Sequence, residues 1–335
     1  VLQQVEHFNN PGVTANDAFK SVTKYFDRIT RPEQILQTLP QAIQTMLDPA
    51  DCGPACLSLS QDVQGEVYEY PEEFFKERVH NIRRPRPDDF QIKEAAEKIK
   101  KSKNPLLISG GGVFYSDAMD DVSNFAIKHN IPITQTVMGY STIKRDHSHF
   151  LGPIGGLGGK AANNLAKQTD LAIAVGTKLA DFTTGSWANF ENPDFSLVSI
   201  NVSRFDANKH LAQSVIGDAK VTLQDLSNAL GEWKAPDEWY KKSRDELKNW
   251  NDYVDKESGP TNQELPSYAH AVGAIYRNSD PTDIAVTAAG GLVGEVVQIW
   301  RPKELNTHET EWGFSCMSYE ISGALGIKMA NPDKD

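Results

Sequence analysis

Apolar, strand-like runs alternate with helix-like segments through the middle of the chain, and this alternation constrains the fold more than any other feature. The runs NPLLIS, IPITQTV, DLAIAV and FSLVSINV are separated by segments such as DAMDDVSNFAIKHN and GGKAANNLAKQT. Strands spaced by helices are joined by right-handed crossovers, which place the strands side by side in a mostly parallel sheet. Residues 92–232 are therefore predicted to form a complete, doubly wound α/β domain of Rossmann type, with a last helix in GDAKVTLQDLSNAL.

Each of the two flanking regions has the secondary-structure elements of only part of a domain. Residues 1–66 contain one amphipathic helix, in RPEQILQTLPQAIQTMLD, and one short strand, in GPACLSLSQDV, which are too few elements for a separate core. Residues 267–335 are predicted to form a helix, a buried strand that ends in glycines, and two further helices. The Pro-rich and charged residues 67–91 are predicted to be a linker, and residues 233–266 a second linker with a polar surface helix.

Composition narrows the class of protein. The formal net charge of −11 argues against nucleic acid or an anionic membrane surface as the main partner. No apolar run has the length of a membrane span, and VLQQVEHFNN does not have the pattern of a signal peptide. Three cysteines, an odd and sparse number, favour a reducing cytosol, and Cys52 and Cys56 are expected to be buried structural thiols.

Two short glycine-containing segments near the end of the chain are candidates for a binding site. Gly290 and Gly291 follow a buried strand in VTAAGGLVGE, where glycines allow a phosphate to approach the N–H groups of the next helix. A tight turn that requires positive φ accounts for them equally well. GFSCM, residues 313–317, precedes another helix, and its small residues permit either ligand approach or simple helix entry.

Other motifs carry weaker signals. The glycine runs in SGGGV (glycines 110–112) and GPIGGLGG (152–159) lack the dinucleotide fingerprint, so structural roles are favoured. His147 and His149 form an H-x-H pair without further ligands nearby, which disfavours a metal site. At this level the residues predict an α/β protein with a phosphate-type site near Gly290. An enzyme and a non-catalytic nucleotide-binding module both remain open.

The order of the segments resembles the thiamine-diphosphate enzymes of the acetolactate synthase type. The middle region resembles their central domain in NPLLISGGGV, IPITQTVMGYSTIKRDHSHFLG, TDLAIAVGTKLADFTTGSW and VIGDAKVTLQDL. Residues 1–66 are similar to the end of the pyrimidine-binding domain, in LQQVEH and CGPACLSLSQDV. Residues 267–335 are similar to the start of the diphosphate-binding domain, in DIAVTAAGGL and WGFSCMSYEISGALGIKMA. DPADCGPACLSLSQDVQGEVYEYP and AAGGLVGEVVQIWRP resemble the ring-opening hydrolases of inositol catabolism more than the synthases.

The resemblance implies a specific chemistry. Thiamine diphosphate, with Mg²⁺, would attack a ketone carbon and serve as the electron sink while a C–C bond breaks. In the hydrolases a cyclic dione is opened to a deoxy-glucuronic acid with water as acceptor. A carboligase or decarboxylase acting on 2-oxo acids is the alternative on the same scaffold. KLADFTTGS replaces a segment typical of the synthases' FAD site, so no FAD is expected.

The resemblance also assigns site residues. Gly290, Gly291 and Leu292 match the diphosphate-contacting turn, and Ser315 matches the position whose backbone meets the aminopyrimidine. Met317 matches the apolar wedge that bends the cofactor and brings its amino group to the thiazolium carbon. The other positions assigned to cofactor binding are Gly313, Cys316 and, near the partner subunit's site, Gln3.

The resemblance places two further parts outside the sequence. The family's catalytic Glu is expected upstream of Val1, so the catalytic residue is unknown here, and the Mg²⁺-binding motif is expected beyond Asp335. The chain alone is therefore expected to be inactive. The family's shared active sites imply a homodimer or homotetramer, which is expected in the cytoplasm.

Overall fold

The protein is described by a computed structural model that covers residues 9–10 and 13–335 and divides the chain into two compact units, residues 1–85 and 86–335. Among the helices of this described part, none combines the length and apolarity needed to cross a membrane. Gln3 lies outside the described residues.

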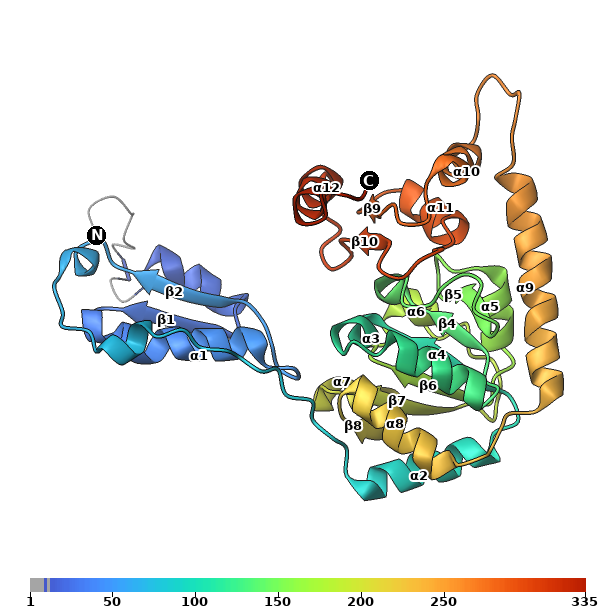
Figure 1. The fold of residues 1–335 in the computed structure, drawn as a ribbon, viewed down its shortest axis with the longest axis horizontal. Helices are drawn as coiled ribbons and strands as arrows, with labels where there is room; N and C mark the ends of the chain where they lie inside the picture. Colours follow the sequence, from blue (N-terminus) through green and yellow to red (C-terminus); the bar gives the residue numbers. More distant parts are fainter. Residues whose placement is uncertain (1–8, 11–12) are drawn as a thin grey trace. The chain divides into compact units, whose positions relative to one another are not determined.

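The first unit is built around two parallel strands and one helix. β1 (Tyr25–Ile29) pairs in register with β2 (Ala55–Leu59), and α1 (Ile35–Leu47) packs against both (Figure 1). The sequence predicted α1 and β2 but not β1, because YFDRI carries two charges and lacks a continuous apolar run. Among its described residues, the buried apolar side chains are those of Ile29 and Ala42.

The expectation that the cysteines of this unit are buried is wrong for Cys52, which is exposed, and Cys56 is only partly buried. Cys52 lies in the turn before β2 rather than in the strand, so its side chain stays outside the small core.

The second unit contains a six-stranded sheet in which every neighbouring pair is parallel, as the alternation predicted. The strand order is β5-β4-β3-β6-β7-β8. Two strands were not predicted, because FLGP and QSVI are short and lie at the two edges of the sheet. The bounds are β3 Pro105–Ser109, β4 Ile133–Gln135, β5 Phe150–Pro153, β6 Leu171–Val175, β7 Ser196–Asn201 and β8 Gln213–Ile216.

Helices cover both faces of this sheet, as a doubly wound domain requires (Figure 1). Successive residues of a strand point to opposite faces, so Leu107 packs in the core on one side and Leu106 and Ile108 in the core on the other. The first face is covered by α2 (Asp89–Lys101), α4 (Met119–Lys128) and α8 (Ala219–Leu230), and the second by α5 (Lys160–Ala166) and the start of α9 (Asp237–Glu257). Three short helices complete the domain: α3 (Gly111–Tyr115), α6 (Asp181–Thr184) and α7 (Arg204–Ala207).

The glycines after β3 allow close packing where the two central strands, β3 and β6, end. A Cβ on Gly110 would lie 2.4 Å from the carbonyl oxygen of Gly176, which follows the neighbouring strand β6. Only glycine permits this approach, since real Cβ atoms essentially never come so near a backbone oxygen.

The last part of the second unit is a smaller layer of three helices and two strands. Its elements are α10 (Tyr268–Asn278), β9 (Ala285–Thr287), α11 (Leu292–Ile299), β10 (His308–Thr310) and α12 (Tyr319–Ala330). β9 and β10 form a parallel pair, and α10 packs on α11. α12 has the predicted position, but none of its residues is buried.

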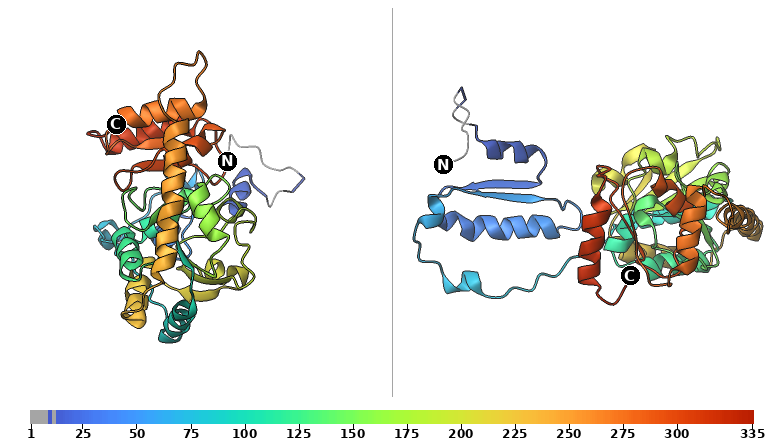
Figure 2. Two further views of the ribbon diagram at one scale, coloured as in Figure 1. Left: turned by 90° about the vertical axis from the view of Figure 1, so that its right-hand side faces the viewer. Right: turned by 90° about the horizontal axis from the view of Figure 1, so that it is seen from above.

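The long helix α9 connects the sheet domain to this layer and packs on both. It faces the viewer in the left view of Figure 2 and runs along the sheet domain toward α10. Near its start, the indole N–H of Trp239 donates to the Pro105 carbonyl at 2.8 Å. Near its end, Trp250 and Val254 belong to a core shared with α10 and α11. The helix therefore packs by its apolar side chains, although its composition is polar.

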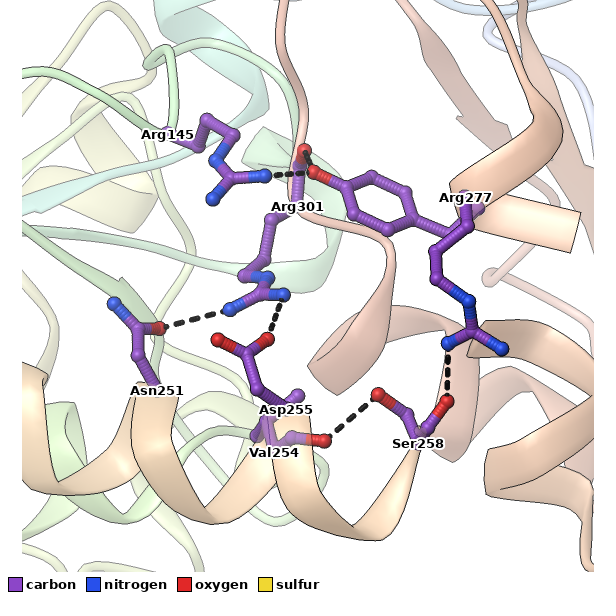
Figure 3. Close-up of polar contacts among 8 residues, drawn as sticks. Arg145, Asn251, Val254, Asp255, Ser258, Arg277 and Arg301 are labelled. Carbon is purple, nitrogen blue, oxygen red and sulfur yellow. Dashed lines mark hydrogen bonds and ion pairs between the residues drawn. The ribbon is translucent and has the colours of Figure 1, made fainter. Parts of the chain in front are cut away.

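Arginines reinforce the junction between the sheet domain, α9 and the last layer (Figure 3). Arg145, from the loop between β4 and β5, donates to the Tyr276 hydroxyl, which donates to the Arg301 carbonyl at 3.1 Å. Arg301 forms an ion pair with Asp255 of α9, and Arg277 of α10 donates to the Ser258 carbonyl. These contacts join three segments far apart in the sequence.

Candidate functional site

The two candidate segments of the sequence meet at one edge of the small β9–β10 sheet. The strands are parallel, with Ala285 opposite His308 and Thr287 opposite Thr310, so the turns that follow them leave from the same edge. The Glu311 N–H donates to the Thr287 carbonyl at 3.1 Å and continues the pairing by one residue. The segment with Gly290 and Gly291 and the 313–317 segment therefore both start at this edge, as binding loops of parallel sheets do.

The first turn leaves open space before a helix. Gly290 has a φ of +129°, a conformation that L side chains rarely adopt, and a Cβ there would meet no atom within 4 Å. Gly291 directly precedes α11, whose first backbone N–H groups have no intrahelical acceptor. Leu292, the first residue of the helix, is 47% exposed. This combination can accept an anionic group, with the positive end of the helix dipole beside it.

The second turn presents apolar side chains to solvent from an unusual backbone. Phe314 is 91% exposed and Met317 is 77% exposed. Ser315 and Ser318 both have positive φ, at 53° and 76°, which is uncommon for residues other than glycine and asparagine. Exposed apolar groups on a strained loop are a common arrangement at ligand sites.

Glu311 shapes this turn, and the sequence analysis did not single it out. Its carboxylate accepts hydrogen bonds from the backbone N–H groups of Phe314, at 2.8 Å, and Cys316, at 2.6 Å. These two bonds, that of Phe314 first, hold the pKa of the Glu311 carboxyl below its usual value. An acid placed a few residues before a run of small residues, as in EWGFSCM, was the available signal.

A buried polar cluster joins α11, the helix that follows the glycine turn, to the sheet domain. The Tyr140 hydroxyl, from the loop after β4, is within 2.6 Å of the carbonyl oxygens of both Val297 and Trp300 at the end of α11. The Tyr140 and His308 rings lie 4.7 Å apart, edge to face. Burial raises the pKa of Tyr140 and lowers that of His308 to about 4, so both groups are neutral near pH 7. The cluster fixes α11, and with it the glycine turn, to the sheet domain.

The other motifs noted in the sequence, the histidine pair and the 152–159 loop, make contacts within the fold. The His147 Nε2–H donates to the Ser123 carbonyl at 3.2 Å, and His149 Nε2 lies 3.1 Å from the Asn130 side-chain oxygen. In the described part of the chain, no group of three or more His, Cys, Asp or Glu has an arrangement that could hold a metal ion. In the 152–159 loop, a Cβ on Gly155 would lie 2.0 Å from the Phe182 carbonyl oxygen, so close packing requires this glycine.

Comparisons with known proteins indicate what the chain is similar to. The family described as thiamine pyrophosphate enzyme, central domain, matches residues 92–226. Over the whole chain, the sequence is 42% identical to a 3D-(3,5/4)-trihydroxycyclohexane-1,2-dione hydrolase from Clostridium tetani, of which it covers 56%. It is 40% identical to the proteins of the same name from Geobacillus thermodenitrificans and Bacillus licheniformis, with 55% and 56% of their lengths covered. The chain thus spans little more than half the length of these curated relatives.

Proposed function

We propose that the chain, whose residues 92–226 match the thiamine pyrophosphate enzyme central domain, belongs to the thiamine pyrophosphate enzymes, and that the protein carrying it is a thiamine-diphosphate-dependent hydrolase. The proposed reaction opens 3D-(3,5/4)-trihydroxycyclohexane-1,2-dione by C–C cleavage and gives 5-deoxy-glucuronate, as a step of myo-inositol catabolism. The observation that carries this proposal is the meeting of the Gly290 and 313–317 turns at one edge, in a chain about 40% identical to hydrolases of that name.

The residues at this edge fit thiamine diphosphate in their chemistry. An anionic diphosphate suits the open turn at Gly290 and Gly291 and the unpaired N–H groups that begin α11. The faces of planar heteroaromatic rings suit the exposed side chains of Leu292 and Met317. Glycine at position 290 is required by the backbone conformation, so the same residue that makes the turn also leaves room for a ligand.

Each residue of the edge has a proposed role. Gly290, Gly291 and Leu292 bind the diphosphate, and the Ser315 backbone orients the aminopyrimidine. Met317 would pack against the cofactor with its apolar side chain. Gly313 and Cys316 complete the loop around it, and Gln3 contributes to the partner subunit's site.

When bound, the cofactor supplies the nucleophilic carbon and the electron sink for C–C cleavage. The chain's own residues bind, orient and shield it. The N-terminus of α11 offsets negative charge, and Met317 and Leu292 exclude water from the reacting face. Because orientation alone accounts for a large share of catalysis, the shape of the 313–317 loop matters as much as its composition.

The assembly and location follow as further parts of the proposal. Mg²⁺ accompanies the diphosphate, since it prefers oxygen ligands from carboxylates, carbonyls and phosphates. The protein is proposed to act as a homodimer or homotetramer in the cytoplasm. The proposed division is the end of a pyrimidine-binding domain in residues 1–66, a central domain in 92–232 and the start of a diphosphate-binding domain in 267–335. Residues 67–91 and 233–266 are the two linkers between them.

Cofactor binding by the intact protein tests this proposal. Calorimetric titration with thiamine diphosphate in the presence of Mg²⁺ should give saturable binding, and Gly290→Val should weaken it by about tenfold or more, because a β-branched residue cannot adopt a φ of +129° without strain. Gly65→Val, at a glycine with open space and ordinary φ, is the matched control. Equal affinity of all three proteins would contradict the placement of the diphosphate.

A further inference from the structure

The 313–317 loop has few packing contacts of its own to define its shape. Phe314 and Met317 point largely into solvent, and none of the residues of the following helix, α12, is buried. Ser315 and Ser318 hold positive φ values that non-glycine residues reach only under constraint. Some other interaction must therefore stabilise this conformation.

The Glu311 carboxylate provides such an interaction. One oxygen accepts from the Phe314 N–H at 2.8 Å and the other from the Cys316 N–H at 2.6 Å, so both oxygens are used by the loop. Hydrogen bonds to an ionised carboxylate are shorter and stronger than those between neutral groups. Gly313 lies within this return of the chain, and a Cβ there would be in ordinary van der Waals contact with the same carboxylate, at 3.7 Å.

The position of Glu311 ties the loop to the rigid part of the site. Its own N–H bonds to the Thr287 carbonyl, at the end of the strand that leads into the Gly290 turn. A single residue therefore connects the β9 edge, through its backbone, to the 313–317 loop, through its side chain.

We propose that Glu311 is a positioning residue that sets the shape of the 313–317 loop and thereby the placement of Ser315 and Met317 against the cofactor. This inference rests on the proposed function. The role requires two acceptor oxygens. A glutamine offers one acceptor oxygen and turns an NH₂ group toward the second backbone N–H, so it cannot replace the carboxylate.

The test compares Glu311→Gln with Glu309→Gln in the intact protein. Glu309 is an exposed acid in β10, two residues before Glu311, and its side chain makes none of the hydrogen bonds that hold the loop. Two quantities are measured: hydrogen–deuterium exchange of a peptide covering residues 313–317 without cofactor, and the affinity for thiamine diphosphate with Mg²⁺. Glu311→Gln should raise exchange and weaken binding by about tenfold or more each, while Glu309→Gln changes neither by more than about twofold.

The outcomes separate this inference from the proposed function. Unchanged exchange in Glu311→Gln, or faster exchange with unchanged affinity, overturns the positioning role while leaving the proposed function intact. Failure of the unaltered protein to bind thiamine diphosphate overturns the proposed function, and the cofactor part of this inference with it. Should Glu311→Gln not fold, Glu311→Asp keeps the charge but withdraws it by one methylene, and the same two changes are expected.

Discussion

Tyr140→Phe is expected to loosen the helix that carries the glycine turn, without removing any group from the turn itself. The Tyr140 side chain is 6% exposed, and its hydroxyl lies 2.6 Å from the carbonyl oxygens of Val297 and Trp300. These carbonyls belong to the last turn of α11, where intrahelical donors are missing. The variant removes the one proton that these two carbonyls share, so a buried acceptor loses its donor.

The size of the effect follows from the loss of a buried donor. Leaving buried polar groups unsatisfied costs about 1–3 kcal/mol, and the hydroxyl remains neutral and able to donate because burial raises the pKa of Tyr140. If α11 opens locally, this loss corresponds to a roughly 5- to 150-fold faster exchange of its backbone amides.

Native-state hydrogen exchange of the α11 amides in the intact protein is the appropriate assay. Tyr115→Phe is the control, because Tyr115 is 84% exposed and its hydroxyl is solvated. The reasoning is refuted if Tyr140→Phe accelerates α11 exchange by less than about twofold, or if both variants accelerate it equally.

Three further predictions concern stability. Burial lowers the pKa of His308 and of His149 to about 4, whereas the same groups in the unfolded chain bind a proton near pH 6.5. The free energy of unfolding should therefore fall as the pH drops from 6.5 toward 4, by on the order of 1–3 kcal/mol per group. Denaturant titrations at several pH values measure this, and a flat profile would contradict the burial of these rings. Gly110→Ala should destabilise the sheet domain by about 1–3 kcal/mol in urea unfolding, whereas Gly65→Ala, which has open space, should change stability by less than about 0.5 kcal/mol. Ser318→Gly should raise the thermal midpoint, by the equivalent of about 0.5–1 kcal/mol, because it relieves a left-handed conformation; a lower midpoint would show that the Ser318 side chain stabilises the turn.

Much of the fold could be predicted from the sequence because the central strands are buried on both faces. PLLIS and LAIAV are continuous apolar runs bounded by turn residues, which is the pattern of interior strands in a parallel sheet. β5 and β8 were not predicted, because edge strands are shorter and need fewer apolar residues. β1 and β10 were not predicted for a similar reason. YFDRI and HET lack a strand-like apolar pattern and form strands because each pairs with a neighbouring strand.

The site was predictable in part only. Gly290 and the 313–317 segment could be singled out as candidates because glycines and small residues at strand ends have few explanations. Glu311, Tyr140 and His308 were not, because their importance lies in contacts between segments. Tyr140 is more than 150 residues from the carbonyls it meets, and nothing in its local sequence indicates that contact.

The most direct test of the account is the product formed by the intact protein. With thiamine diphosphate and Mg²⁺ present, 3D-(3,5/4)-trihydroxycyclohexane-1,2-dione should be converted to a ring-opened acid one water heavier than the substrate, identified by mass spectrometry, and omission of the cofactor should abolish the reaction. Formation of acetolactate from pyruvate, with the dione left unchanged, would contradict the hydrolase assignment and favour the carboligase alternative.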